Sequence, residues 1–244
     1  MFKKIILLLI LTFIIKQNTT FGQSATRQIA QQNHIWFIEN GTVKLKENWV
    51  LFHDIQFRRA DFGADAQQIL VRIGLLYNFP SKLQVGAGYA FAQTYPYGEF
   101  PVKNAFPEHR IWEQAQFKME LGKFNVFNRY RLEQRFIGDA STGQFQPSRF
   151  ENRMRYMVRV NRPIGEKFYI NAFDEIFVNF GKNIGRNIFD QNRIGANVGY
   201  KLNKKVAVEL GYLNQMLQLR TLNSSNQNRL EFNRTATLSI VSNF

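Results

Sequence analysis

The chain has 244 residues, a formal net charge of +14 and no cysteine, which excludes disulfide bonds, thiolate metal sites and a cysteine nucleophile. Hydrophobic residues make up 45% of it, 24 of them Phe, and this composition excludes a disordered chain. A mean hydropathy of −0.31 excludes a helical membrane bundle, and the length suits one all-β domain.

The first 22 residues have the three parts of a secretory signal peptide. Lys3 and Lys4 give a positive start, residues 5–15 form an apolar run, and Thr20-Phe21-Gly22 offers small residues for cleavage. The apolar run has 11 residues, whereas a membrane-spanning helix takes roughly 20. We therefore expect a cleaved signal peptide at 1–22 and an exported barrel domain at 23–244, rather than an N-terminal anchor.

Beyond this segment, apolar and polar residues alternate with a period of two, which indicates half-buried strands. Ten segments of this kind follow one another, at 47–59, 66–79, 82–94, 108–120, 123–137, 148–161, 166–178, 190–202, 204–216 and 229–244. His34–Glu39 resembles an eleventh strand, and 25–32 can supply a twelfth that keeps the number even. We expect an all-β fold, an antiparallel transmembrane β-barrel of about 10–12 strands.

The connections between these segments differ in length. Those at 79–82, 121–123, 162–166 and 202–204 are short, and those at 60–65, 95–107, 138–147, 179–189 and 217–228 are longer and rich in Gly, Asn, Ser, Pro and charge. Short periplasmic turns and longer external loops are typical of outer-membrane barrels. The long strands also suit a tilted membrane crossing, which takes roughly 9–11 residues, better than a soluble lipocalin-like barrel.

The alternation separates an apolar face from a charged one, and in a membrane barrel the apolar face meets lipid. The charged face of the segments 123–137 and 148–161 is mostly arginine, and we expect it to line the lumen. The predicted lumen cluster consists of Arg129, Arg131, Glu133, Arg135, Glu151, Arg153, Arg155, Glu175 and Arg193. The same alternation adds Arg58, Arg72, Arg110, Glu120, Glu209 and Glu231.

Two interpretations of this interior stay open. Charges that line a pore set its selectivity, so the arginines can form a narrow passage for small anionic solutes. Alternatively, Arg–Glu ladders fill the lumen of a structural barrel, because about eight strands enclose only side chains and open channels begin nearer 16. The expected strand number favours the filled lumen, whereas the excess of Arg over Glu opposes it, since buried charges need partners.

Two parts of the chain resemble known proteins. The last segment ends in Phe244 after Leu238 and Ile240, which resembles the C-terminal signal read by the barrel-assembly machinery. The runs Phe-Glu-Asn-Arg-Met-Arg-Tyr-Met at 150–157, Phe-Asp-Glu-Ile-Phe-Val-Asn at 173–179, and 190–195 through Gly211-Tyr212 are similar to the family called domain of unknown function 2490, outer-membrane barrels common in Bacteroidota.

This resemblance covers roughly residues 33–244, and it implies a fold and an outer-membrane location but no activity. The shared positions are Glu151, Arg153, Asp174, Glu175, Asn192 and Arg193. They form either a polar cluster in the lumen or, as we prefer, residues that fix strand register and fill the lumen.

No catalytic or metal-binding motif is recognisable. Neither His53 nor His109 is followed by Ser at the His-x-Ser spacing of outer-membrane phospholipases, and His53 and Asp54 point to opposite faces of a strand. Ligand-spaced His, Asp and Glu are absent from the sequence pattern, and Gly86-Ala87-Gly88 lacks the third glycine of a phosphate loop. We expect no enzyme, no cofactor and no metal; a Ser/His pair on one outward face near the rim would instead indicate a lipid-active enzyme.

The sequence therefore predicts an exported outer-membrane barrel of uncharacterised role. Its expected partners are outer-membrane lipid, lipopolysaccharide and, through the C-terminal strand, the assembly machinery. Nucleic acid is not expected, because an exported basic barrel meets lipopolysaccharide phosphates first. Besides a narrow passage or a filled structural barrel, the alternatives are a lipid-active enzyme and a binding protein that works through loop aromatics such as Tyr95, Tyr97 and Phe100.

Overall fold

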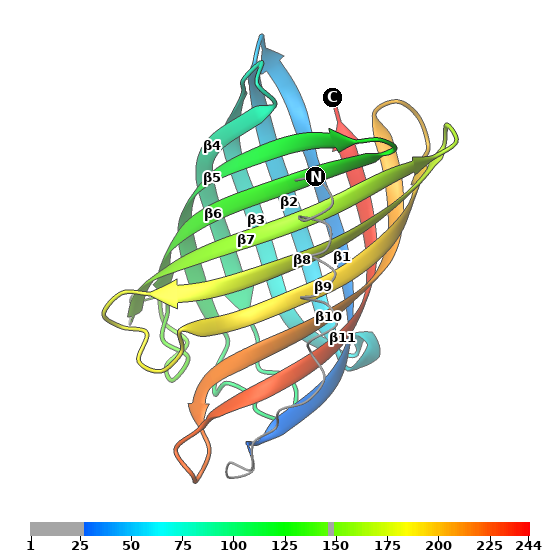
Figure 1. The fold of residues 1–244 in the computed structure, drawn as a ribbon. Helices are drawn as coiled ribbons and strands as arrows, with labels where there is room; N and C mark the ends of the chain where they lie inside the picture. Colours follow the sequence, from blue (N-terminus) through cyan, green and yellow to red (C-terminus); the bar gives the residue numbers. More distant parts are fainter. Residues whose placement is uncertain (1–26, 146–148) are drawn as a thin grey trace, which may run out of the picture.

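The computed structural model describes residues 27–145 and 149–244, so the predicted signal peptide at 1–22 lies outside the described residues. They form eleven strands and one short 3-10 helix, η1 (Asp61–Gly63), as Figure 1 shows. The strands are β1 (Ile29–Lys46), β2 (Trp49–Ala60), β3 (Asp65–Asn78), β4 (Leu83–Thr94), β5 (Phe106–Leu121), β6 (Phe124–Ile137), β7 (Arg149–Ile164), β8 (Phe168–Phe180), β9 (Phe189–Lys201), β10 (Val206–Leu222) and β11 (Asn228–Asn243). No helix within these two ranges is long and apolar enough to cross a membrane.

All eleven strands join in one closed barrel. Each strand pairs antiparallel with its neighbours in sequence, and β1 and β11 close the ring as a parallel pair, from Ile29 opposite Leu230 to Thr42 opposite Asn243. The predicted all-β barrel of 10–12 strands is thus confirmed, with one correction, since the ring is not antiparallel throughout. An odd number of alternating strands leaves the first and the last running in the same direction.

β1 is the strand that the alternation identified only in part. His34–Glu39 lies in its middle, and the twelfth strand expected at 25–32 does not form among the described residues, because from Ile29 onward this segment is already β1. Asn40 and Gly41 interrupt the apolar pattern, yet both pair with β11 on one side and β2 on the other. Pairing on both sides therefore overrides a weak local preference.

Short turns gather at one end of the barrel and longer loops at the other. Connections at the turn end have two to four residues, whereas those at the loop end reach eleven residues in the β4–β5 loop (95–105) and the β6–β7 connection. The loop expected at 217–228 shrinks to 223–227, because β10 continues to Leu222 through an irregular register. The predicted asymmetry of the two ends is present, although the β2–β3 loop around η1 is as short as a turn.

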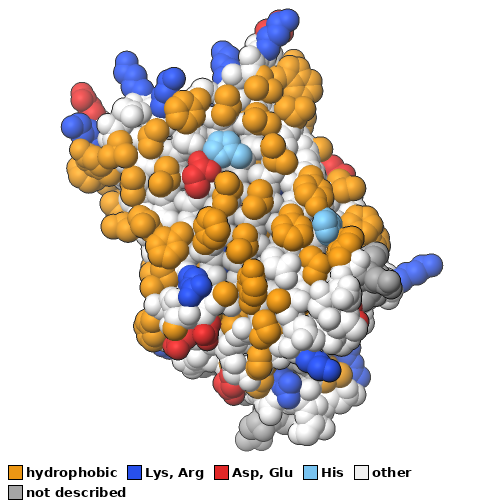
Figure 2. Space-filling view, turned by 180° about the vertical axis from the view of Figure 1, so that it is seen from behind, with side chains coloured by type: hydrophobic (Ala, Val, Ile, Leu, Met, Phe, Trp, Pro, Cys, Tyr) orange, Lys and Arg blue, Asp and Glu red, His pale blue; other side chains and the backbone are white. Residues whose placement is uncertain are grey.

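The apolar face of the strands points outward, and Figure 2 shows hydrophobic side chains spread over one side of the barrel. In β11, Leu238 and Ile240 are exposed while Thr237 and Ser239 between them are buried, and Phe244 continues the outward face. Every strand contributes an exposed large hydrophobic residue, among them Phe37, Phe57, Ile73, Tyr89, Ile111, Tyr130, Met154, Ile176, Ile194, Leu210 and Ile240. The polar faces must therefore meet inside the barrel.

Part of the interior is filled by apolar side chains around Trp112, which is fully buried. Its indole lies against Gly74 and Gly88, which pair across β3 and β4. A Cβ at these two positions would lie 2.3 and 2.6 Å from Trp112 Cζ2, so only glycine leaves room for the ring. We call this group the apolar plug; its members are Trp112, Leu76, Ala90, Val50 and Phe52.

Candidate functional site in the barrel lumen

A cavity of about 790 Å³ occupies the lumen beside the apolar plug. Its lining reaches from Arg149 and Thr221, near the loop ends of their strands, to Thr42 and Gln84, near the turn ends. Twelve arginines line it against eight aspartates and glutamates, so positive charge is in excess. A cleft lined by one sign of charge raises the local concentration of the opposite ion.

The residues predicted for the lumen gather around this cavity. Those that line it are Arg129, Arg131, Arg135, Glu151, Arg153, Arg155, Glu175 and Arg193, together with Arg58, Arg72, Arg110, Glu209 and Glu231. Glu133 is 1% exposed and does not line the cavity itself, but it is bonded to two of the arginines that do. The alternation of the strands thus places the whole predicted cluster in one interior.

Three residues that the sequence grouped with the lumen lie elsewhere. Glu120 is at the exposed turn end of β5, 3.3 Å from the amines of two lysines. Asp174 and Asn192 face outward, where Asn192 Nδ2 donates to Asp174 Oδ1 at 2.6 Å. Consecutive residues of a strand point to opposite faces, so Asp174 cannot share the lumen with Glu175, and Asn192 cannot share it with Arg193.

Eight of the cavity's arginines form ion pairs with carboxylates. The largest network is centred on Glu133, which accepts from Arg153 Nη2 at 2.5 Å and from Arg155 Nη1 at 2.6 Å. Arg153 also reaches Asp190 at 2.8 Å and Arg155 reaches Glu175 at 2.9 Å, so the network joins β6, β7, β8 and β9. We call these eight the paired arginines: Arg72, Arg110, Arg129, Arg135, Arg149, Arg153, Arg155 and Arg220.

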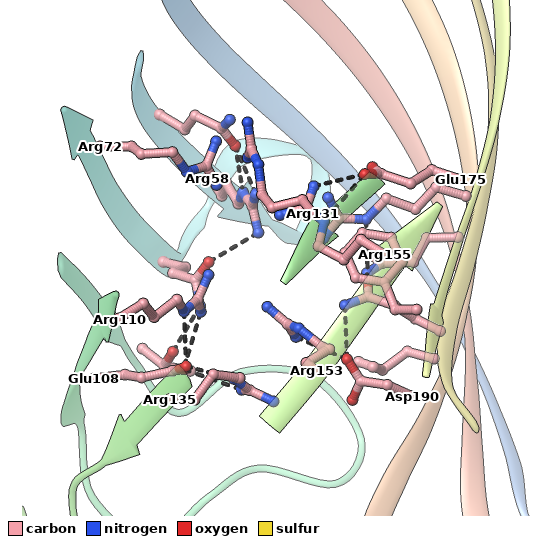
Figure 3. A pocket seen from close by; sticks show the side chains of 18 of the residues that line it. Arg58, Arg72, Glu108, Arg110, Arg131, Arg135, Arg153, Arg155, Glu175 and Asp190 are labelled. Atoms are coloured by element: carbon pink, nitrogen blue, oxygen red, sulfur yellow. Dashed lines mark hydrogen bonds and ion pairs between the residues drawn. The ribbon is translucent and has the colours of Figure 1, made fainter. Parts of the chain in front are cut away.

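β5 and the neighbouring β6 carry a second network. Figure 3 shows Glu108 between Arg110 and Arg135, whose Nε atoms lie 2.7 and 2.5 Å from its Oε1. Arg72 Nη1 lies 2.5 Å from Asp54 Oδ2 on the same side. These carboxylates are almost fully buried, and a buried charge is tolerated only with partners of this kind.

The remaining four arginines lie over aromatic rings. Within the described ranges no carboxylate lies at ion-pair distance from them, and we call them the stacked arginines: Arg58, Arg131, Arg159 and Arg193. The guanidinium carbon lies 4.1 Å from the Trp36 ring centre for Arg58, 4.9 Å from Trp112 for Arg131, 5.8 Å from Phe173 for Arg159 and 4.9 Å from Phe177 for Arg193. A ring face attracts a cation without cancelling its charge, so these four charges stay available to the cavity.

The aromatic partners are the part of the site that the sequence did not single out. Trp112 lies two residues from Arg110, and Phe177 lies two residues from Glu175, so the period of two already placed both rings on the charged face. Their role depends on which guanidinium of a neighbouring strand meets them, and spacing along one strand carries no information on that.

The β4–β5 loop covers part of the cavity's loop end. The rings of Tyr97 and His34 meet edge to face with centres 5.7 Å apart, and the Tyr97 hydroxyl donates to Glu231 Oε2 at 3.4 Å. Phe100 lies 4.7 Å from the Arg229 guanidinium carbon. Burial, together with the Glu231 carboxylate, raises the pKa of Tyr97, so its hydroxyl keeps the proton of this bond. The loop is therefore fastened to β1 and β11 across the barrel mouth.

A polar cluster faces outward at the parallel seam. His53 Nδ1 is 2.9 Å from Glu39 Oε2, and the Ser242 hydroxyl donates to Glu39 Oε1 at 2.9 Å. Figure 2 shows a histidine and an acidic side chain side by side within the hydrophobic surface. A Cβ at Gly41 would lie 2.1 Å from Ser242 Oγ, so the glycine makes room for the serine. The serine is bonded to a carboxylate and not to the imidazole that a nucleophile needs, and the cluster links β11, β1 and β2.

The other histidines do not gather with further metal ligands. His109 Nδ1 is hydrogen-bonded to the Tyr89 hydroxyl on the outward face, and its ring centre lies 4.1 Å from that of Phe145. No group of three or more His, Cys, Asp or Glu that could hold a metal ion occurs in the part of the chain that the structure describes.

Comparison with known proteins adds a family and one distant structural likeness. The family described as "Protein of unknown function (DUF2490)" matches residues 33–226, and no curated protein matches the chain. An anion-selective porin from Comamonas acidovorans has a similar solved structure, with 13% identity, 80% of this chain and 56% of the porin covered, and a TM-score of 0.35. The chain thus spans about half the length of that porin, and at this level of likeness nothing of the porin's function carries over.

Proposed function

Because the chain belongs to DUF2490, a family of unknown function, its role has to come from its own barrel, and we propose that it is an outer-membrane protein that offers small anions a narrow passage lined by arginine. The proposal has three parts: the location, an interior that solutes can enter, and a preference for negative charge. Each part is supported by a different feature of the molecule.

The outward surface supports the membrane location. Large hydrophobic side chains are exposed on all eleven strands, whereas a soluble protein rarely exposes a continuous apolar surface of this kind. Short turns at one end and longer loops at the other agree with the usual arrangement of outer-membrane barrels. An N-terminal signal peptide, cleaved after residue 22, would deliver the chain to that membrane.

The cavity supports a passage. Its volume of about 790 Å³ equals that of roughly 25 water molecules, and residues near both ends of the strands line it. Eleven strands lie between the filled barrels of about eight and the open channels of about 16, which agrees with a narrow interior. The paired arginines, with their carboxylates, take up the volume that makes the passage narrow.

The stacked arginines are the observation that carries the proposal. Six carboxylates offset most of the charge of the eight paired arginines, but Arg58, Arg131, Arg159 and Arg193 hold theirs against rings that neutralise nothing. A barrel filled only to be stable would gain from a carboxylate beside each of these guanidiniums, because unpaired buried charge is costly. An interior that must attract anions needs the charge left uncancelled.

Lipid, lipopolysaccharide and the assembly machinery remain the proposed partners, the last through the C-terminal strand and its exposed Phe244. The proposal includes no catalytic step. In the outward cluster the Ser242 hydroxyl is bonded to Glu39 and not to His53, and this arrangement supports a role without a serine nucleophile.

Conductance in a planar bilayer tests the proposal. Protein purified in detergent, with heat-modifiable migration as the sign of a folded barrel, should give steps that prefer anions. Arg193→Glu and Arg159→Glu should move the reversal potential toward cation preference. Lys204→Glu is the matched control, since it makes the same change of charge at an exposed turn residue outside the lumen. A folded barrel that stays silent would leave the filled structural barrel as the better hypothesis.

A further inference from the structure

Two of the stacked arginines share one ring. Trp36 is 2% exposed and is held by a hydrogen bond from its Nε1 to Gln67 Oε1 at 2.8 Å. The guanidinium carbon of Arg58 lies 4.1 Å from the Trp36 ring centre, and that of Arg193 lies 5.2 Å from it. Arg58 comes from β2 beside β1, whereas Arg193 comes from β9, with β10 and β11 between it and β1. Two like charges are thus brought together from different parts of the ring.

Neutral amides, not carboxylates, position both guanidiniums. Arg58 donates from Nε and Nη2 to Gln56 Oε1 at 3.0 and 2.6 Å, and from Nη1 to Gln68 Oε1 at 2.8 Å. Arg193 donates from Nε to Gln191 Oε1 at 3.0 Å. Each terminal nitrogen of Arg58 keeps one N–H beyond these bonds, and Arg193 keeps those of both terminal nitrogens. The amides fix the orientation of the two guanidinium groups and do not neutralise their positive charge.

The carboxylates of this region are bonded to other groups. Asp54 holds Arg72 at 2.5 Å and accepts from Gln56 at 2.9 Å. Glu175 holds Arg129 at 2.6 Å and Arg155 at 2.9 Å. Glu231 also lines the cavity and forms no ion pair in the described part of the chain; it is bonded to Tyr97 and Asn233. No carboxylate lies at ion-pair distance from Arg58 or Arg193 among the residues that the structure describes, so an anion from outside the chain can supply the charge that this pair lacks.

The space at this pair is limited. Trp36, Arg58 and Arg193 line the cavity together with Tyr97 of the β4–β5 loop. The Tyr97 ring rests on His34, two residues from Trp36 on the same strand face, so the loop covers this part of the lumen. Figure 3 shows Arg58 in the same cavity as Arg131 and Arg155. A ligand here has to be small.

We propose that Arg58 and Arg193, set against Trp36 beneath the β4–β5 loop, form a binding site for a small oxyanion, a phosphate or carboxylate group, within the passage. The proposal rests on the proposed function, because it names the class of solute that the passage holds. Guanidinium forks match the paired oxygens of carboxylate and phosphate, whereas a halide offers one atom. The site therefore favours oxyanions over chloride.

Titration with inorganic phosphate, and in a separate arm with sodium acetate, tests the site on the full chain purified in detergent. Tryptophan emission is the signal, and Trp36→Phe identifies the part that comes from Trp36. Arg58→Gln and Arg193→Gln should each weaken binding about tenfold or more, the loss expected for a charge-assisted hydrogen bond. Arg162→Gln removes an exposed arginine that lies 5.5 Å from the Phe124 ring centre outside the cavity; it is the matched control and should leave binding unchanged.

Two further measurements separate the effect of charge from that of geometry. Arg193→Lys keeps the positive charge and loses the paired N–H donors of the guanidinium, so the folded variant should bind phosphate several-fold more weakly than the wild type. Equal affinity in the wild type, Arg193→Gln and Arg162→Gln would overturn the site, as would an affinity for chloride equal to that for phosphate. Binding to a barrel that conducts nothing would support the site and contradict the passage, whereas conduction without binding would do the reverse.

Discussion

The two sets of arginines in the lumen face the same cavity and follow the same strand alternation, but their partners differ. Glu133, Glu108 and Glu175 hold paired arginines through short ion pairs between neighbouring strands. The stacked arginines lie over Trp36, Trp112, Phe173 and Phe177. The first set fastens strands to one another, and the second keeps its charge for the cavity. Arg153 and Arg155 of the first set also lie over Phe177, so a ring alone does not distinguish the two sets. The position of an arginine on the lumen face therefore does not reveal its role, because the role depends on whether a carboxylate lies within ion-pair distance.

Glu133→Gln should break this contrast most severely. Glu133 is 1% exposed and receives both Arg153 and Arg155, so its loss leaves two buried guanidiniums in part uncompensated. Removing one partner of a buried pair costs about 3–5 kcal/mol, and we expect a loss of that size in the free energy of unfolding in detergent. Glu120→Gln, at an exposed pair with two lysines, should leave stability unchanged. An equal effect of both variants would show that the paired arginines do not fasten the wall.

Gly74→Ala should have the next largest effect, because it disturbs the ring beneath Arg131. The new Cβ would lie 2.3 Å from Trp112 Cζ2 and 2.6 Å from the Ala87 carbonyl oxygen. Overpacking of this kind costs about 1–3 kcal/mol, measurable in the same unfolding experiment. The double variant Gly74→Ala with Trp112→Phe should recover part of that loss, since the smaller ring leaves space. No recovery would place the conflict at the backbone carbonyl and not at the ring.

Arg159→Gln should sharpen the contrast from the other side, with a clear change of selectivity and little change of stability. Arg159 forms no ion pair among the described residues and lies 5.8 Å from Phe173. One charge acting through water over a few ångströms is worth ~1 kcal/mol, so the anion-to-cation permeability ratio should fall roughly fivefold. Reversal potentials in a salt gradient measure it. If the free energy of unfolding falls as far as it does in Glu133→Gln while the permeability ratio stays unchanged, Arg159 stabilises the barrel in the same way as the paired arginines.

Tyr97→Phe should give the smallest effect. It removes the 3.4 Å bond to Glu231, so stability should fall by about 1 kcal/mol, while the β4–β5 loop loses one of its contacts with β11. Current through the barrel should rise slightly or fluctuate more. Because burial raises the pKa of Tyr97, the wild-type current should stay constant from pH 8 to about 10, at which an ordinary tyrosine has lost about half of its protons. A transition in that interval would mean that the hydroxyl is open to water.

Much of the barrel follows from local pattern. The ten predicted segments correspond to β2 through β11, because apolar and polar residues alternate along the whole length of a strand that has one apolar and one polar face. The same alternation put Arg131 and Glu133 on the inner face. It also explains the errors at Asp174 and Asn192, which were grouped by family resemblance although their immediate neighbours already occupied the lumen face.

What the sequence could not supply is information on partners far apart along the chain. Arg193 reaches Trp36 across two intervening strands, and this depends on the curvature of the closed ring. The extent of β1 depended on pairing with β11, whose residues are some 200 positions away. Neither relation leaves a local periodicity, so charges were predictable and their partners were not.

The parallel pairing of β1 with β11 also places the two ends of the barrel domain at different rims. β1 starts at the loop rim and β11 ends at the turn rim, so the chain enters the ring at one rim and leaves it at the other. In the proposed outer membrane, epitopes inserted before Ile29 and after Phe244 would therefore stand on opposite sides of the bilayer. Antibody binding to intact cells could reach only one of them, and that single result would fix the orientation of the whole molecule.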